Sequence, residues 1–299
     1  MNFENWTCRA SVLGTIMTGT IGLTQAQNNT LQSLLNRQAE FDAGDVKKKL
    51  TDKMVADMEE LLKKQENREI PKTVQSELRK VYRSLKYNRD FNFTNKYLQK
   101  GIHMEEASIT ILSKHLDRPL LKYKGDRVFG THFQGQPDIV EKKKGWDVKS
   151  SWSLQTFPWP DDDLDSIYEW QNQAYMELFA KDEWTTAKCL VNPTDRILMN
   201  EVNKHWYAMG QPELDDPLWV EMAKSVERDM IVDMAQFQNH YPYYSMMYHQ
   251  EGEWQHDIPE EERIVLFHSY RSDEKIKEAK ERVEICRSYL SEIHQKFSK

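Results

Sequence analysis

The chain has 299 residues, 39% of them hydrophobic and 30% charged, and a mean hydropathy of −0.80. No apolar stretch approaches the roughly 20 residues that span a bilayer, and residues 10–23 lack a charged leader and a cleavage site, so we expect a cytoplasmic protein with no membrane partner. The net charge of −7 argues against a protein that coats duplex nucleic acid through an overall basic surface.

The hydrophobic pattern predicts a mixed α/β protein. A short apolar helix or turn over 8–18 opens the chain, and Pro71 is typical of the start of a later helix. In chain order, the predicted elements are helices over 24–39, 45–66 and 71–87, a loop over 88–94, a helix over 95–115, strands over 119–124, 127–133, 137–141 and 146–152, a helix over 164–180, a strand over 185–192, helical chain from 194 to about 238, a strand over 263–270 and a helix over 273–297.

This order predicts one domain over 1–299 with four regions. They are a helical N-terminal region over 1–94, a core over 95–193, a helical insertion over 194–255, and a final strand and helix over 256–299. The three cysteines, Cys8, Cys189 and Cys286, are too scattered for a metal site or a disulfide framework, which fits a reducing compartment.

Two of the predicted strands form a hairpin that carries Asp138, Asp147 and Lys149. A glycine-containing turn over 142–145 interrupts two runs rich in β-branched and aromatic residues, which is a hairpin signal. A turn at this position places Asp138 roughly opposite Asp147. Because side chains alternate along a strand, Asp147 and Lys149 share one face while Val148 points to the other. Asp138, Asp147 and Lys149 are therefore expected to converge at one end of a sheet.

These residue types suit metal-dependent cleavage of a phosphodiester. Carboxylates are natural ligands of Mg²⁺, which offsets the charge of the phosphate and acidifies a bound water, and Mn²⁺ is a possible substitute. Asp138 and Asp147 would hold the metal, and the carbonyl oxygen of Val148 could join them. Lys149 could stabilise the attacking hydroxide or the developing negative charge. The alternative is an ordinary hairpin with exposed charges.

The Pro-Asp pair at Asp138 and the Asp-Val-Lys run at 147–149 resemble the active-site signature of the PD-(D/E)XK nuclease superfamily, with Asp in place of the more usual Glu. Lys100, Gly101 and Glu105 resemble a K-G-x-x-x-E helix of that superfamily, which implies that Glu105 reaches toward the metal. Two neighbouring side chains remain open as alternatives to Glu105 for this role, namely Glu106 and His103.

Two further segments are similar to the phage exonuclease type, the branch that includes YqaJ, lambda exonuclease and RecB-like proteins. Gln171 and Tyr175 match a Q-x-x-x-Y helix, and residues four apart share a helix face, so both could point at the site. Arg9 and Ser11 match an N-terminal R-x-S segment, which implies that they bind DNA phosphate. The motifs span residues 9 to 175 in the order that the family shows.

The resemblance implies a restriction-endonuclease-like core, with a mixed central sheet flanked by helices. It also implies a Mg²⁺-dependent deoxyribonuclease, phage-encoded and acting in the host cytoplasm, that digests duplex ends or a single strand during recombination or DNA processing. The catalytic residues would be Asp138, Asp147, Lys149, Glu105, Gln171 and Tyr175. A single-strand annealing protein is a plausible partner, and a homo-oligomer is compatible with the resemblance.

Two other functions remain open. One is an endonuclease on the same core, because exonucleases and endonucleases share this cleavage chemistry and differ in access to DNA. The other is a catalytically inactive DNA-binding or assembly protein that kept the fold. The sequence does not distinguish DNA from RNA, or one cleavage polarity from the other.

Overall fold

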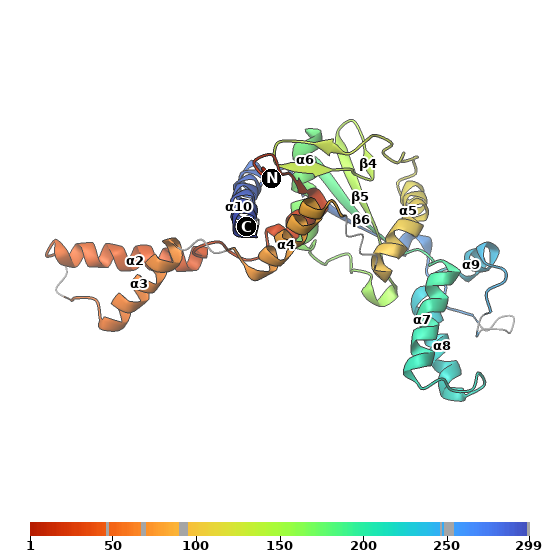
Figure 1. Cartoon of the computed structure of the whole chain (residues 1–299). Coiled ribbons are helices and arrows are strands. Elements are labelled where there is room, and N and C mark those ends of the chain that lie inside the picture. The colour runs from red at the N-terminus through yellow and green to blue at the C-terminus, as the bar shows by residue number, and fades with distance from the viewer. Residues whose placement is uncertain (46–47, 67–69, 90–94, 246, 248–253, 298–299) are drawn as a thin grey trace. The chain divides into compact units, whose positions relative to one another are not determined.

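The computed structural model describes the chain except for residues 46–47, 67–69, 90–94, 246, 248–253 and 298–299 (Figure 1). The chain divides into two compact units. The first unit comprises Met1–Trp6, Val12–Asp90 and Glu278–Lys299, and the second comprises Thr7–Ser11 and Phe91–Lys277. A short N-terminal segment thus belongs to the same unit as the predicted core.

The first unit is helical. It contains most of α1 (Ala10–Ile16), all of α2 (Gln25–Asp42), α3 (Asp52–Glu66) and α4 (Lys72–Tyr87), and the later part of α10 (Asp273–Phe297). Thr24 begins α2 with a capping box, in which Thr24 and Gln27 each bond the other's backbone N–H. Helices α2 and α3 lie side by side (Figure 1). Asn88 ends α4 in the left-handed conformation that is common at helix C-termini.

Two β-sheets form the centre of the second unit. The smaller sheet has the order β1-β3-β2, formed by Cys8–Arg9, Phe133–Gly135 and Val128–Phe129. The larger sheet has the order β4-β5-β6-β7, formed by Ile139–Val140, Lys144–Ser150, Glu183–Cys189 and Ile264–Tyr270. Strands β5 and β6 are parallel, whereas β4 and β7 run antiparallel to their neighbours. The larger sheet is therefore mixed, as expected.

Helices α5 (Lys96–His115) and α6 (Ser166–Phe179) cover the larger sheet. Leu112 of α5 belongs to a buried cluster with Trp146 and Val148 of β5. Asn172 of α6 donates a hydrogen bond to Thr186 of β6 at 3.0 Å, on the other face. Because β5 and β6 are parallel, the chain needs a crossover between them, and α6 provides it.

The insertion contains α7 (Asp195–Ala208), α8 (Pro217–Met230) and α9 (Met234–His240). These helices bury a core of their own around Trp219 and Phe237. Two short 3₁₀ helices, η1 (Leu154–Thr156) and η2 (Glu260–Glu262), complete the secondary structure of the described ranges. Among those ranges, no helix is both long and apolar enough to cross a membrane.

Most of the predicted elements are confirmed within a few residues, but the predicted strand over 119–124 is wrong. In this segment the backbone N–H of Tyr123 donates to the carbonyl of Asp138 at 2.7 Å, whereas the N–H of Leu120 donates to the Ser113 hydroxyl. The segment therefore does not form a regular series of hydrogen bonds with a neighbouring strand. The predicted strand over 127–133 is in fact two short strands, β2 and β3. Most of the predicted loop over 88–94 lies outside the described residues, as do residues 46–47 of the predicted helix over 45–66.

Candidate active site

The hairpin of β4 and β5 has the predicted register. Ile139 pairs with Trp146, so the preceding Asp138 comes opposite Asp147. The backbone N–H of Val148 donates to Oδ2 of Asp138 at 2.6 Å. The side chain of Val148 points into the buried cluster under α5. The alternation predicted along this strand is confirmed, and Asp138 is held against the strand that carries the other two charged residues.

Asp147 and Lys149 form a close ion pair on the face of the sheet that α6 covers. Nζ of Lys149 lies 3.0 Å from Oδ1 and 2.8 Å from Oδ2 of Asp147. Gln171 of α6 donates a second hydrogen bond to the same Oδ1 at 2.9 Å. Asp147 is only 2% exposed, and its Oδ2 accepts no hydrogen bond of acceptable geometry from the described residues despite its closeness to Lys149. Oδ2 of Asp147 is thus paired with an ammonium and accepts no further hydrogen bond from the described residues, and a carboxylate oxygen held this way can bind a metal ion in place of the ammonium.

The surroundings in this cluster raise the pKa values of both Asp138 and Lys149 above their ordinary values. Burial, helped by the neighbouring Asp147 carboxylate, raises the pKa of Asp138 to about 7. Burial alone would lower the pKa of Lys149, but the carboxylates of Asp147 and Asp138 outweigh it and raise that pKa above its ordinary value. Lys149 therefore stays a cation, while Asp138 gains a proton more readily than an ordinary aspartate.

Glu105 lies at the edge of this cluster. It is carried by α5, and its charge contributes to the raised pKa of Asp138. Its Oε1 is 2.9 Å from Nζ of Lys122. Glu106 and His103, the two alternatives, have exposed side chains. The geometry thus favours Glu105 among the three, although its role as a ligand stays a prediction.

Tyr175 supports the site from α6. Its hydroxyl donates to the carbonyl of Gln136 at 3.1 Å, and its ring stacks on Trp184 with centroids 5.0 Å apart. Two glycines make room for these rings, because a Cβ at Gly135 would lie 2.6 Å from the Tyr175 ring and one at Gly145 would lie 2.2 Å from the Trp184 ring. In this structure Tyr175 braces the segment that enters the hairpin, and its predicted place at the phosphate remains untested.

The prediction from sequence missed Lys188, which lies beside Lys149. The two residues are register partners on β6 and β5, so their side chains share a face of the sheet. Nζ of Lys188 lies 3.9 Å from the centroid of the Tyr168 ring, and Nζ of Lys149 lies 5.6 Å from the same centroid. Alternation along the predicted strand over 185–192 could have placed Lys188 on the face of Thr186, but only the pairing register brings it to Lys149.

Arg9 and Ser11 lie in the segment that joins the smaller sheet. Arg9 is exposed and pairs in register with Gln134 of β3, four residues before Asp138. Ser11 is exposed in the first turn of α1. No ion pair is found for Arg9 among the residues that the structure describes. Both residues are accessible, and their predicted binding of a phosphate stays a prediction.

The carboxylates of Asp138, Asp147 and Glu105 are donors that suit a hard divalent cation, although in this structure they are not arranged around a single point. Within the described ranges, no three His, Cys, Asp or Glu side chains lie close enough together to hold a metal ion. Lys122 engages Glu105 and Lys149 engages Asp147. The oxygen chemistry of the three carboxylates nevertheless matches what Mg²⁺ or Mn²⁺ binds.

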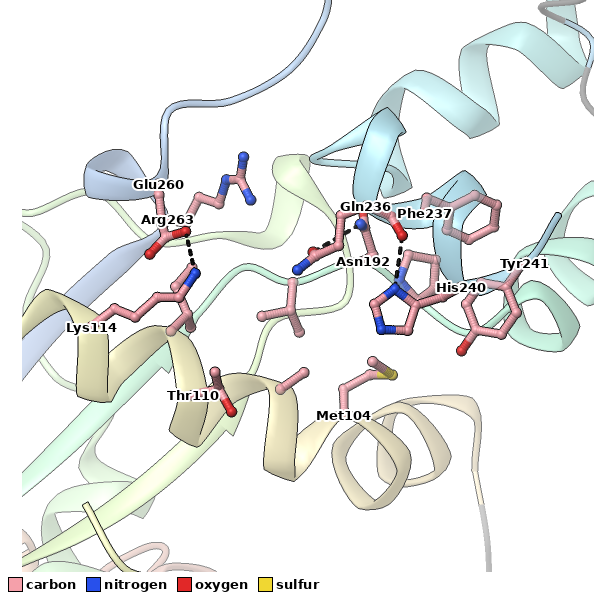
Figure 2. A pocket seen from close by; sticks show the side chains of 14 residues that line it. Met104, Thr110, Lys114, Asn192, Gln236, Phe237, His240, Tyr241, Glu260 and Arg263 are labelled. Atoms are coloured by element: carbon pink, nitrogen blue, oxygen red, sulfur yellow. Dashed lines mark hydrogen bonds and ion pairs between the residues drawn. The ribbon is translucent and has the colours of Figure 1, made fainter. Parts of the chain in front are cut away.

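A separate cavity of about 210 Å³ lies on another side of α5 (Figure 2). Its walls come from α5, the chain after β6, α9, and η2 with the residue that follows it, and include Met104, Phe237 and His240. Lys114 and Glu260 close one side with an ion pair of 3.1 Å (Figure 2). None of the residues predicted to act in catalysis lines this cavity.

No family model matches the chain, and no curated protein matches its sequence. Solved structures do match. One is a phage-related exonuclease from Haemophilus somnus 129PT, with a TM-score of 0.58 and 19% identity over 98% of this chain and 96% of that one. Another is the alkaline exonuclease LHK-Exo from Laribacter hongkongensis, with a TM-score of 0.50 and 9% identity over 99% of this chain and 93% of that one. The chain therefore has the fold of these exonucleases, as the motifs in its sequence implied.

Proposed function

We propose that this protein is a metal-dependent DNA exonuclease that hydrolyses phosphodiester bonds. The observation that carries the proposal is the hairpin in which Asp138 comes opposite Asp147, with the Lys149 ammonium 2.8 Å from Asp147. The two structural neighbours are exonucleases by name, which supports the same activity on this fold. Because one fold can host several functions, the argument depends on the site itself.

The proposed ligands of Mg²⁺ or Mn²⁺ are the carboxylates of Asp138, Asp147 and Glu105 with the carbonyl of Val148. When bound, such an ion neutralises charge on the phosphate and acidifies water. Gln171 would keep Asp147 oriented, because its amide donates to Oδ1 at 2.9 Å and does not engage Oδ2.

Lys149 acts as an electrostatic stabiliser in this proposal and not as a base. The two aspartates raise its pKa and outweigh the loss of hydration around the ammonium, so it keeps its proton at neutral pH. A fixed ammonium beside the attacking oxygen stabilises the negative charge that develops during attack on phosphorus. The Lys149 side chain is 29% exposed, which leaves it accessible from solvent.

Arg9 and Ser11 would bind a phosphate of the same DNA strand. Arg9 belongs to a strand that pairs with β3, and β3 leads directly into Asp138, so a phosphate bound at Arg9 is held by the same unit as the acids. Digestion from one end would leave a single strand, for which a single-strand annealing protein is the partner that we propose.

End-labelled linear duplex and covalently closed circular duplex, each with Mg²⁺, test this proposal. We expect the linear DNA to be digested and the circles to survive. Lys149→Met and Asp147→Asn should each lower the rate by about 100-fold or more. Lys143→Met serves as the matched control, because Lys143 is an exposed lysine in the turn of the same hairpin.

The outcomes separate the three functions that the sequence left open. Cleavage of circles at the same rate as linear DNA would replace the exonuclease with an endonuclease. DNA binding without metal-dependent cleavage in the wild-type protein would indicate a catalytically inactive binding or assembly protein. Equal activity in the wild type and in Lys149→Met would contradict the catalytic role that we propose for Lys149 and its hairpin.

A further inference from the structure

An ion pair that the proposed chemistry does not use lies at the edge of the candidate site. Nζ of Lys122 is 2.9 Å from Oε1 of Glu105, and the two side chains are 46% and 23% exposed. Lys122 belongs to no helix or strand. Its place beside Glu105 must therefore be fixed by the residues around it.

The chain next to Lys122 is attached to the entry of the hairpin. The backbone N–H of Tyr123 donates to the carbonyl of Asp138 at 2.7 Å. The ring of Tyr123 packs edge-on against Phe179 of α6, with centroids 5.7 Å apart at 84°. These contacts hold the backbone of Lys122 beside Asp138, and from there its side chain reaches Glu105 on α5.

The ammonium of Lys122 is surrounded by acids. Its Nζ pairs directly with Glu105, and the charges of Glu106 and Asp138 also act on it. Two of these three acids, Glu105 and Asp138, are proposed ligands of the metal. Lys122 thus places an ammonium where a divalent cation is expected to bind.

We infer that Lys122 is an internal counter-cation that holds Glu105 in the metal-free protein and is displaced when Glu105 binds the metal ion. The inference rests on the proposed function, because it takes Glu105 as a ligand. It explains why Glu105, Asp138 and Asp147 do not form a group of three metal-binding side chains among the described residues, because Glu105 is paired with Lys122. It also makes Lys122 a positioning residue, which sets the metal affinity without touching the scissile bond.

Titration calorimetry of the full chain with Mn²⁺ tests the inference. Lys122→Met should bind Mn²⁺ about fivefold more tightly, since the ion no longer competes with an ammonium in a partly exposed pair. Lys124→Met is the matched control, because Lys124 is exposed in the same segment and no ion pair is found for it in the described part of the chain. Its affinity should equal that of the wild type, and Lys122→Gln should repeat the gain.

Combining Lys122→Met with Glu105→Gln tests whether Lys122 affects the metal affinity through Glu105. If Lys122 acts through Glu105, Lys122→Met should give no gain there. An unchanged or weaker affinity in Lys122→Met and Lys122→Gln overturns the inference. So does an equal gain in Lys124→Met, or a gain that survives Glu105→Gln.

Failure of the inference can be told from failure of the proposed function. If the wild type binds Mn²⁺ and digests linear DNA while the Lys122 variants bind Mn²⁺ no more tightly, only the inference fails. If the wild type neither binds Mn²⁺ nor cleaves DNA, both fail.

Discussion

Replacement of Gly145 by alanine tests whether packing under β5 holds Asp147 and Lys149 in the positions that the proposed function requires. An added Cβ would lie 2.2, 2.3 and 2.5 Å from three atoms of the Trp184 ring. The indole cannot yield easily, because Trp184 is 0% exposed and its ring stacks on Tyr175 with centroids 5.0 Å apart at 22°. The strand and the two rings would have to move together.

The expected cost is about 3 kcal/mol, the upper part of the usual range for overpacking a filled core. For a unit of the size that contains Gly145, this corresponds to a fall of about 6–12 °C in the melting temperature. Asp147 is two residues away, and a displacement of about 1 Å at a catalytic group can lower the rate about 100-fold. We expect both losses in Gly145→Ala.

Thermal unfolding followed by circular dichroism measures the first loss, and digestion of linear DNA measures the second. Gly101→Ala is the control, because its Cβ meets nothing within 4 Å and its backbone is helical. Alanine there should stabilise the protein by about 0.5–1 kcal/mol. If the two glycine variants unfold at the same temperature, the packing argument is refuted.

Three further predictions concern charge and orientation at the site. Burial and the Asp147 carboxylate raise the pKa of Asp138 to about 7, so the folded metal-free protein holds a proton that the unfolded chain has released. The free energy of unfolding should therefore fall as the pH rises from about 4 to about 7, and urea titrations of Asp138→Asn should lack this component. Burial lowers the pKa of Lys100 to about 7, so above that pH the unfolded chain binds more protons than the folded protein does. The free energy of unfolding should therefore rise between about pH 7 and 10, and an identical rise in Lys100→Met would contradict this assignment. Gln171→Ala removes the donor to Oδ1 of Asp147 and should weaken Mn²⁺ binding at least about tenfold by calorimetry, whereas an unchanged affinity would count against its orienting role.

The arrangement of the hairpin could be predicted from the sequence because it depends on local rules. A strand has a side-chain period of two, and the position of the turn fixes which residues face each other. Those two facts were enough to place Asp138 opposite Asp147, with Val148 pointing away. The helix of Glu105 was also predictable, since Asn95 caps it and its pattern is regular.

Contacts made by chain without regular structure could not be predicted. Lys122 lies in a segment whose composition suggested a strand, and its partner Glu105 is on a helix, so no periodic pattern connects the two. Lys100 matched a family motif, but no pattern in the sequence indicated that its side chain is fully buried and that its ammonium donates to the carbonyl of Trp152 at 2.8 Å. Both contacts depend on tertiary packing, which overrides what composition suggests for a lysine.

The pairing of Cys8 with Phe133 has a consequence for biosynthesis. The first strand leaves the ribosome long before its partner, and at roughly 5–20 residues per second the delay is about 6–25 s. During that interval Arg9 has no strand to join. The proposed phosphate anchor and the proposed metal ligands can therefore become ordered only in the same late stage of folding, so a nascent fragment carries neither alone.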